Sequence, residues 1–415
     1  MVATLISFGA LFASALFFLM GGGVLFTQLS LRMTQEGFST LTIGMTLACY
    51  FVGLMCGYFL CHRLIERVGH IRSFAVFAAT TTIIIILHGL FISAIFWAIL
   101  RFFNGITVFG LFMVVESWLN ECSHSQTRGR VFSIYMTLTY MGIGIGQQLL
   151  NLGDNGGQQL FWIAALLFSL SLIPVSITQS IHPELPHPTR YTFKALFQKV
   201  PLGMLGCFAS GLVNSAFFSM VPVFGTKIGL SVFQLSWVMS TTVIGGFAVQ
   251  WLIGIISDRF DRTLVLGIIA GFVALLSLSM AMNTGISYAW LLFEMTIFGG
   301  LIFAVYPLAV ARANDIFEGK ETVAVSSALL LCYSIGAIFG PVLASVAMTL
   351  LKTPYGLFVY WSVVAGAFGV MTIYLRHKER IAIIQPAEQV NFAPMRNTSP
   401  VAMVLDPRAD TKADK

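Results

Sequence analysis

Three charged side chains lie inside long apolar stretches of the chain, where water cannot solvate them: Arg101, Glu116 and Glu294. A charge near the centre of a bilayer costs at least about 2.5 kcal/mol, so each needs a partner or a water-filled cavity. An ionisable group in such a place can bind an oppositely charged ligand, carry a proton or hold a structural ion pair. These residues are therefore the first candidates for binding and proton-transfer chemistry.

Motifs for covalent catalysis or nucleotide binding are missing from the sequence. It contains no GxxxxGK[ST], no HExxH and no G-x-S-x-G elbow in a soluble context. The six cysteines form no CxxC pair, so neither disulfides nor a metal site are predicted. We expect no enzyme, no cofactor, no metal and no ATP-driven pump.

The composition indicates a protein that spans a membrane many times. Hydrophobic residues make up 57% of the chain and charged residues 10%, whereas a soluble domain carries about 25% charged residues. Apolar runs long enough to cross a hydrocarbon core of about 30 Å recur throughout. The first run has no basic region before it and no small-residue cleavage site, so we expect a retained span. We therefore expect the chain to lie in a lipid bilayer and to bind no nucleic acid.

Twelve spans can be placed along the chain, with boundaries good to a few residues. They cover 5–31, 40–62, 73–93, 94–119, 131–152, 160–180, 201–225, 232–256, 263–284, 288–312, 323–350 and 356–375.

Lysine and arginine positions predict which side of the membrane each loop faces. Of the 23 basic residues, only Arg32, Lys227 and Lys352 fall in loops on one side, and Arg101 lies within a span. All others fall in the opposite loops and the carboxy-terminal tail. We therefore expect both termini in the cytoplasm of a bacterium, with the spans in its inner membrane.

Several landmarks recur at nearly the same offset, close to half the chain length. They are Trp97 and Trp290, Tyr140 and Tyr333, and Gly142-x-x-x-Gly146 and Gly336-x-x-x-Gly340. A constant offset indicates an internal duplication. The predicted organisation is an amino-terminal six-helix bundle (1–181), a cytoplasmic linker (182–200), a carboxy-terminal six-helix bundle (201–375) and a disordered cytoplasmic tail (376–415).

Two charged hairpins between spans also correspond under this duplication. The second contains Gly254, Asp258, Arg259 and Arg262, and the first contains Glu66, Arg67, Gly69 and Arg72. An acid can cap a neighbouring helix start, while arginines hold helix carbonyl ends and carboxylates. The clusters anchor the topology by their positive charge, and the sequence leaves open whether they also act as a conformational latch.

Together these motifs resemble the major facilitator superfamily over most of the chain. The second hairpin matches that family's loop signature except that Asp261 replaces the usual glycine, and Arg101-Phe102-x-x-Gly105 resembles its fourth-span signature. Stretches such as VVESWLN, RGR and ALLLCYSIGAIFGP are similar to the bacterial YcaD-like subgroup. The resemblance implies an all-α membrane protein of twelve transmembrane helices in two pseudo-symmetric six-helix bundles.

Glycine spacing and Glu116 have structural interpretations beside functional ones. Close helix approach at a seam between halves, or ordinary small-residue packing, would explain the glycines at 142, 146, 336 and 340, together with Pro341. For Glu116 we favour a structural partner among Arg67, Arg128 and Arg130 over a substrate or proton role.

Arg101 and Glu294 occupy corresponding spans, which line the central cavity in the resembled fold. Each sits about 9 Å outside the midpoint of its span. They could pair across the cavity, or each could make a local contact within its own half. Other polar candidates on the cavity helices are Gln28, Asn104 and Asn214.

The sequence thus predicts a secondary transporter that moves a small organic molecule by alternating access, coupled to protons. Direction is left open between efflux of lipophilic compounds and uptake of a metabolite or chelator. A non-transporting membrane receptor on the same scaffold is the alternative. No obligate protein partner is indicated.

Overall fold

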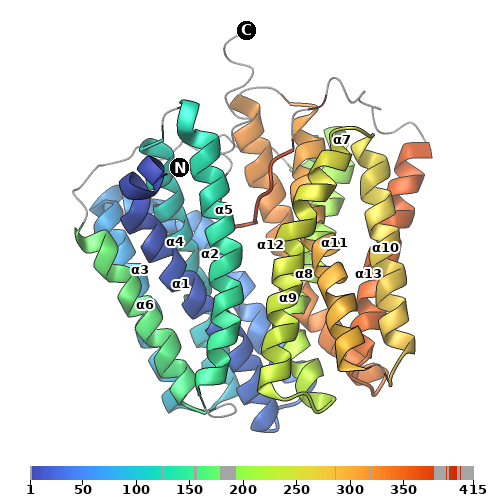
Figure 1. Ribbon diagram of the computed structural model, residues 1–415, viewed down its shortest axis with the longest axis horizontal. Helices are drawn as coiled ribbons and strands as arrows, with labels where there is room; N and C mark the ends of the chain where they lie inside the picture. The colour runs from blue at the N-terminus through green and yellow to red at the C-terminus, as the bar shows by residue number, and fades with distance from the viewer. Residues whose placement is uncertain are drawn as a thin grey trace. The chain divides into compact units, whose positions relative to one another are not determined.

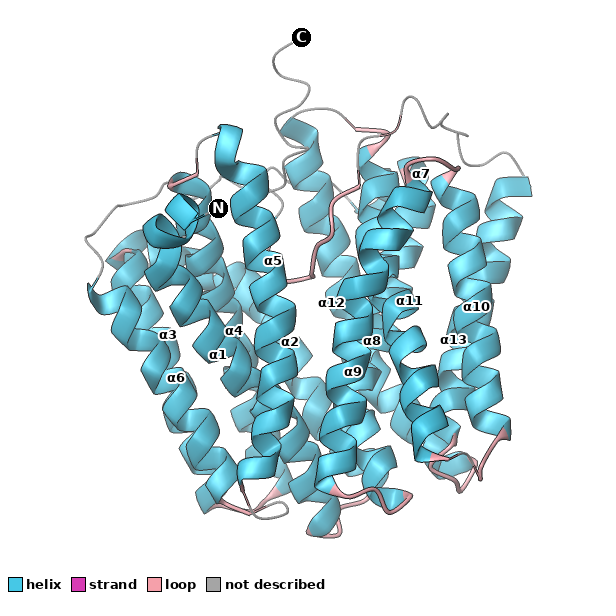
Figure 2. Cartoon of the chain, viewed as in Figure 1, coloured by secondary structure: helices cyan, strands magenta, loops and turns pink. Residues whose placement is uncertain are grey.

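The computed structural model describes residues 2–123, 125–153, 157–177, 193–285, 287–317, 320–377, 389, 392–399 and 402. In these residues the regular structure is helical throughout (Figure 2). Helices form because hydrocarbon offers no hydrogen-bond partners, and a helix satisfies its backbone internally. Eleven of the described helices are long and apolar enough to cross a membrane. The predicted all-α membrane fold is confirmed.

The remaining expected span, 131–152, coincides with α5 (Ser125–Gln148) and the 3-10 helix η1 (Leu149–Leu152). These elements are not among the eleven candidates. Polar side chains, including Thr137, Thr139 and Gln147, interrupt the apolar run of α5 and lower its mean hydropathy.

The chain forms two compact units, Met1–Pro186 with Phe218–Ser240, and His187–Phe217 with Thr241–Lys415. Besides α5 and η1, unit 1 contains α1 (Val2–Gln35), α2 (Thr40–Val68), α3 (His70–Leu90), α4 (Ala94–Glu121) and α6 (Gln159–Ile177). Unit 2 holds α7 (Phe193–Lys199), α10 (Arg262–Met282), α11 (Tyr288–Asn314), α12 (Lys320–Leu350) and α13 (Gly356–His377) (Figure 1). Two helices, α8 (Pro201–Lys227) and α9 (Val232–Ser257), contribute to both.

Close helix pairs repeat between the two halves of the sequence. In unit 1, α2 and α4 approach at Gly53 and Gly105, where an added Cβ would meet the carbonyl oxygens of Phe102 and Tyr50. In unit 2, α9 and α11 approach at Gly245 and Gly299 in the same way. Only glycine allows the backbones this near, so the duplication predicted from sequence landmarks also appears in the packing.

Helix starts show the same correspondence. Ser93 accepts a hydrogen bond from the Phe96 N–H at the start of α4, and Ser287 accepts one from the Trp290 N–H at the start of α11. Serine is a favoured N-cap because its hydroxyl satisfies an N–H that has no intrahelical partner. These caps place α4 and α11, which carry Arg101 and Glu294.

The end of α8 and the beginning of α9 belong to unit 1, which differs from the boundary expected at residue 201. Polar contacts hold them there. Gln148 Nε2 donates to Ser240 Oγ at 2.7 Å, and Ser240 Oγ donates to the Gly144 carbonyl at 2.9 Å. Ser30 Oγ donates to the Ser219 carbonyl at 2.9 Å. Hydrogen bonds of this kind are favourable where no water competes.

The tail was expected to be disordered, and no span was expected in the linker. Within the linker, residues 182–192 lie outside the described residues, and α7 is a short helix that the sequence did not predict. Within the tail, 392–399 has a defined and largely buried place in unit 2, which differs from the expected disorder of 376–415. The tail has no sustained apolar pattern, which suggested disorder, but contacts with α9 and the hairpin after it hold these residues in place.

Candidate functional site

Arg101 lies in α4 with its side chain completely buried in unit 1. Its guanidinium carbon is 4.4 Å from the ring centroid of Phe26 on α1 and 4.4 Å from that of Tyr50 on α2. Aromatic faces attract a cation, most strongly where water is excluded. The two rings contact each other edge to face, with centroids 4.7 Å apart, so the charge lies against one side of an aromatic pair.

Hydrogen bonding leaves much of the guanidinium unsatisfied. Nη1 donates to Asn104 Oδ1 at 2.9 Å, while Nε and Nη2 have no hydrogen-bond partner among the described residues. Nor does any described carboxylate form an ion pair with Arg101. A buried cation with free donors is costly unless a ligand completes its shell, so the geometry suits an anionic group.

Two neighbouring candidates on the same unit also keep unused polar atoms. Asn104 Nδ2 has no hydrogen-bond partner in the described part of the chain, although its Oδ1 accepts from Arg101. Gln28 Nε2 donates to the Gly157 carbonyl at 3.0 Å, and its Oε1 has no partner there. These side chains can therefore offer both a donor and an acceptor to a polar ligand.

Glu294 and Asn214 lie in unit 2. Ser279 Oγ donates to Glu294 Oε1 at 2.9 Å, and Oε2 has no hydrogen-bond partner among the described residues. Asn214 Nδ2 donates to Ser210 Oγ at 3.1 Å. Both side chains therefore have a local contact within unit 2. A pair between Arg101 and Glu294 would join the two units and stays a prediction.

Glu116 is fully buried in α4 and accepts a hydrogen bond from the Tyr135 hydroxyl of α5 at 2.8 Å. This partner was missed, because nothing in a sequence of apolar spans singles out one tyrosine. The contact links two helices of unit 1 and favours the structural role expected for Glu116. The suggested arginine partners at 67, 128 and 130 stay predictions.

The hairpin between α9 and α10 forms a charge network around a buried arginine. Arg262 is fully buried, donates from Nη2 to Asp258 Oδ1 at 2.7 Å and from Nη1 to Asp315 at the end of α11. Asp261 caps α10 by accepting from the Thr263 N–H at 2.9 Å and pairs with Arg376 at 3.3 Å. Asp315 and Arg376 were not predicted. Both lie just past an apolar run, which is the only signal the sequence gives.

The first hairpin, between α2 and α3, is different. Glu66 pairs with His62 at 3.2 Å with half of its side chain exposed, and Arg67 and Arg72 are exposed on the surface. Gly69 has a φ of 86°, which favours glycine in this turn. The structure thus brings Asp258 and Arg262 of the second hairpin together, whereas among the described residues no ion pair joins Glu66 to Arg67 or Arg72 in the first. Arg259 in the second hairpin is also exposed.

The paired glycines pack inside their own units. An added Cβ on Gly142 would lie 2.8 Å from Leu19 Cβ, and one on Gly146 would meet the Met20 carbonyl, both on α1. On α12, Gly336 and Gly340 approach α8 at Phe208 and Leu212. Pro341 follows within α12. Whether α5 and α12 also slide at a seam stays a prediction.

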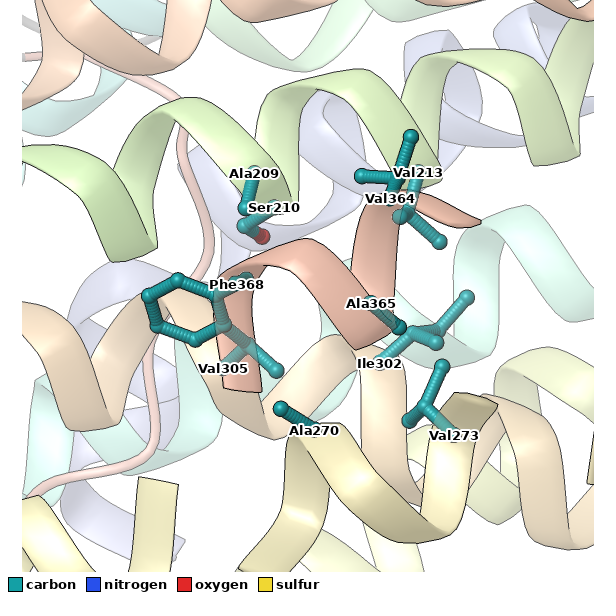
Figure 3. A pocket seen from close by; sticks show the side chains of 10 residues that line it. All are labelled: Ala209, Ser210, Val213, Ala270, Val273, Ile302, Val305, Val364, Ala365 and Phe368. Carbon is teal, nitrogen blue, oxygen red and sulfur yellow. The ribbon is translucent and has the colours of Figure 1, made fainter. Parts of the chain in front are cut away.

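A small cavity lies between α8, α10, α11 and α13 of unit 2 (Figure 3). Its lining is apolar apart from the Ser210 hydroxyl, and its volume is about 20 Å³. Such a space holds about one water molecule, whereas small-molecule sites measure roughly 300–1,000 Å³. It is therefore not the substrate site.

Cys122, at the carboxy-terminal end of α4, has no sign of a reactive thiol. Burial, followed by the nearby charge of Glu121, raises the pKa of Cys122 above its usual value. Because the thiolate is the nucleophile, this shift disfavours redox or catalytic chemistry at that position.

Long apolar helices, two sequence-related halves and isolated charges inside the bundles define a polytopic membrane carrier rather than an enzyme. The family model described as the Major Facilitator Superfamily matches residues 11–341, and the chain belongs to this superfamily of secondary transporters. The superfamily resemblance stated from the motifs is thus confirmed.

Relatives and solved structures agree with this assignment. The chain is 30% identical over 328 residues to an uncharacterized MFS-type transporter YcaD of Escherichia fergusonii, covering 78% of this chain and 84% of the relative. Its fold is similar to a D-xylose-proton symporter, with a TM-score of 0.72, 16% identity, and 93% and 99% of the two chains covered. A nucleoside transporter NupG mutant gives a TM-score of 0.72 at 13% identity, covering 88% and 98%. At these identities the structures support the fold alone.

Proposed function

We propose that this protein is a proton-coupled transporter of small organic molecules that carry an anionic group. The observation behind the proposal is the Arg101 guanidinium, which is buried against a pair of contacting aromatic rings. Two of its nitrogens lack a hydrogen-bond partner in the described part of the chain. A carboxylate or phosphate would complete its donors in a bidentate pair. The surrounding rings favour a cargo with an apolar or aromatic body.

Glu294 is the proposed proton-carrying group. It is a buried carboxyl whose described contact is a single hydroxyl donor, so losing or regaining a proton breaks no ion pair within unit 2. Alternating access would bring such a group into contact with each side in turn. One structural neighbour is a D-xylose-proton symporter, which is consistent with this proposal.

The orientation we propose places both termini in the cytoplasm and the chain in a bacterial inner membrane. Basic residues concentrated in one set of loops support the orientation, and the bacterial source of the relatives supports the membrane. Transport by alternating access remains part of this proposal.

A thermal-shift screen tests the anionic cargo. Purified protein would be heated with a library of organic acids, each beside its uncharged amide. A ligand present at 100 times its Kd stabilises the protein by about 2.7 kcal/mol. We expect some acids to raise the melting temperature and their amides not to do so.

Two variants complete the test. Arg101→Gln should abolish the response to acids, and Arg101→Lys should weaken it, because lysine keeps the charge but loses the planar fork. An amide that stabilises as well as its acid, or an unchanged response in Arg101→Gln, would contradict the proposed role of Arg101.

A further inference from the structure

The tail residues Phe392–Ser399 run along α9 in extended form, within unit 2 (Figure 1). Four of them are buried: Ala393, Met395, Thr398 and Ser399. Pro394 restricts the backbone of this segment and disfavours a helix. The segment is therefore bound through contacts with the helix and not through regular structure of its own.

The first contact is with the charged hairpin. The Phe392 N–H donates to Asp258 Oδ1 at 2.9 Å and lies 3.2 Å from Oδ2. The same carboxylate accepts from Arg262 Nη2 at 2.7 Å. Gln389 Nε2 also donates to the Phe260 carbonyl in this hairpin at 3.2 Å. The tail and the charge network thus share Asp258.

The second contact explains a glycine of the family signature. An added Cβ on Gly254 would lie within 2.4 Å of Phe392 Cδ1, and its three nearest neighbours are all ring atoms of Phe392. Gly254 has no need of glycine for its helical backbone. Its missing side chain makes room for the Phe392 ring.

The third contact lies one turn further along α9. Gln250 is fully buried, and its Nε2 donates to the Met395 carbonyl at 3.4 Å and to the Phe303 carbonyl of α11 at 3.0 Å. Gln250, Gly254 and Asp258 are spaced four residues apart, so they form one stripe about 12 Å long that follows α9 to the residue just past its end. The tail follows this stripe in the opposite direction.

We propose that the stripe Gln250–Gly254–Asp258 is a peptide-binding groove whose ligand is the chain's own tail, through Gln389 and Phe392–Ser399. We further propose that the bound tail restrains the hairpin between α9 and α10. The ligand class is a short, extended, uncharged-to-basic peptide with an aromatic anchor. Because the tail shares Asp258 with Arg262, a rearrangement of this carboxylate requires the tail to leave first. Eleven residues separate the end of α13 from Gln389, which as an extended chain reach about 36 Å and allow release and rebinding.

Hydrogen exchange on the full chain in lipid nanodiscs tests this proposal without a substrate. In the unmodified protein, amides of 392–399 should be protected. Gly254→Ala places a methyl group against the Phe392 ring, and Phe392→Ala removes the anchor. Both should speed exchange in the tail and in the hairpin residues 258–261 by about tenfold or more. Gly271→Ala in α10 is the matched control, because an added Cβ there has open space.

A cross-link supplies an independent readout. In a variant whose native cysteines are replaced, the pair Gly254→Cys and Phe392→Cys should form a disulfide under mild oxidation. The reason is that a Cβ at position 254 points directly at the side chain of residue 392. Oxidation should slow hairpin exchange, and reduction should reverse the effect. Unprotected tail amides in the unmodified protein would overturn the groove. Faster tail exchange with unchanged hairpin exchange would overturn the restraint.

Discussion

The charge network around Arg262 leads to a quantitative prediction, because its two acidic partners differ in burial. The Asp315 side chain is fully buried with Arg262, whereas the Asp258 side chain is 34% exposed. Removing one partner of a buried ion pair costs about 3–5 kcal/mol, because the other charge stays buried without it. A partly exposed pair is screened by water and contributes about 0–1 kcal/mol.

Asp315→Ala should therefore destabilise unit 2 by about 3–5 kcal/mol. Asp258→Ala should cost less, about 1–2 kcal/mol, because it removes a screened ion pair and the hydrogen bond from the Phe392 N–H. Glu66→Ala in the first hairpin is the matched control. Its ion pair involves a half-exposed carboxylate and a histidine, so we expect almost no change.

The assay is chemical unfolding of the purified protein in one detergent, followed for all variants by the same signal. We expect the loss of stability to follow the order Asp315→Ala, then Asp258→Ala, then Glu66→Ala. Equal losses for Asp315→Ala and Glu66→Ala would refute the reasoning, because burial would then not determine the strength of these pairs.

Three further predictions concern coupling, packing and topology. Glu294→Gln should abolish substrate transport driven by a proton gradient, while substrate exchange at equal pH survives. Both are measured in proteoliposomes with an organic acid found in the thermal-shift screen. Normal gradient-driven transport by the variant would exclude the coupling role. Gly105→Ala should destabilise unit 1 by about 1–3 kcal/mol, the usual cost of overpacking, because the added Cβ meets the Tyr50 carbonyl. Gly144→Ala is the control and should be nearly neutral in the same unfolding assay, because an added Cβ there meets nothing. Alkaline phosphatase fused at Glu36 or Lys227 should be active and a carboxy-terminal fusion inactive; the reverse pattern would overturn the orientation.

Most of the fold could be predicted from the sequence because the bilayer restricts the possibilities so strongly. The span expected at 263–284 is α10 (Arg262–Met282), and the one at 288–312 is α11 (Tyr288–Asn314). Helices such as α2 continue past the expected span, because helical hydrogen bonds do not stop at the edge of the hydrocarbon. The positions of the basic residues likewise predict which loops share a side of the membrane, and the repeated landmarks predict the duplication, because both are visible in the sequence without knowledge of the packing.

The sequence by itself determined that Arg101 and Glu294 are charges in costly surroundings, and that the chain is a duplicated membrane transporter. Only the tertiary structure decided their neighbours: the rings of Phe26 and Tyr50 for Arg101, and Ser279 for Glu294. The same holds for Asp315 beside Arg262 and for the tail beside Gly254. Hydrophobic periodicity identifies which segments enter the membrane, but the partner of a buried polar group depends on which distant segments pack together, and that is a property of the whole folded chain.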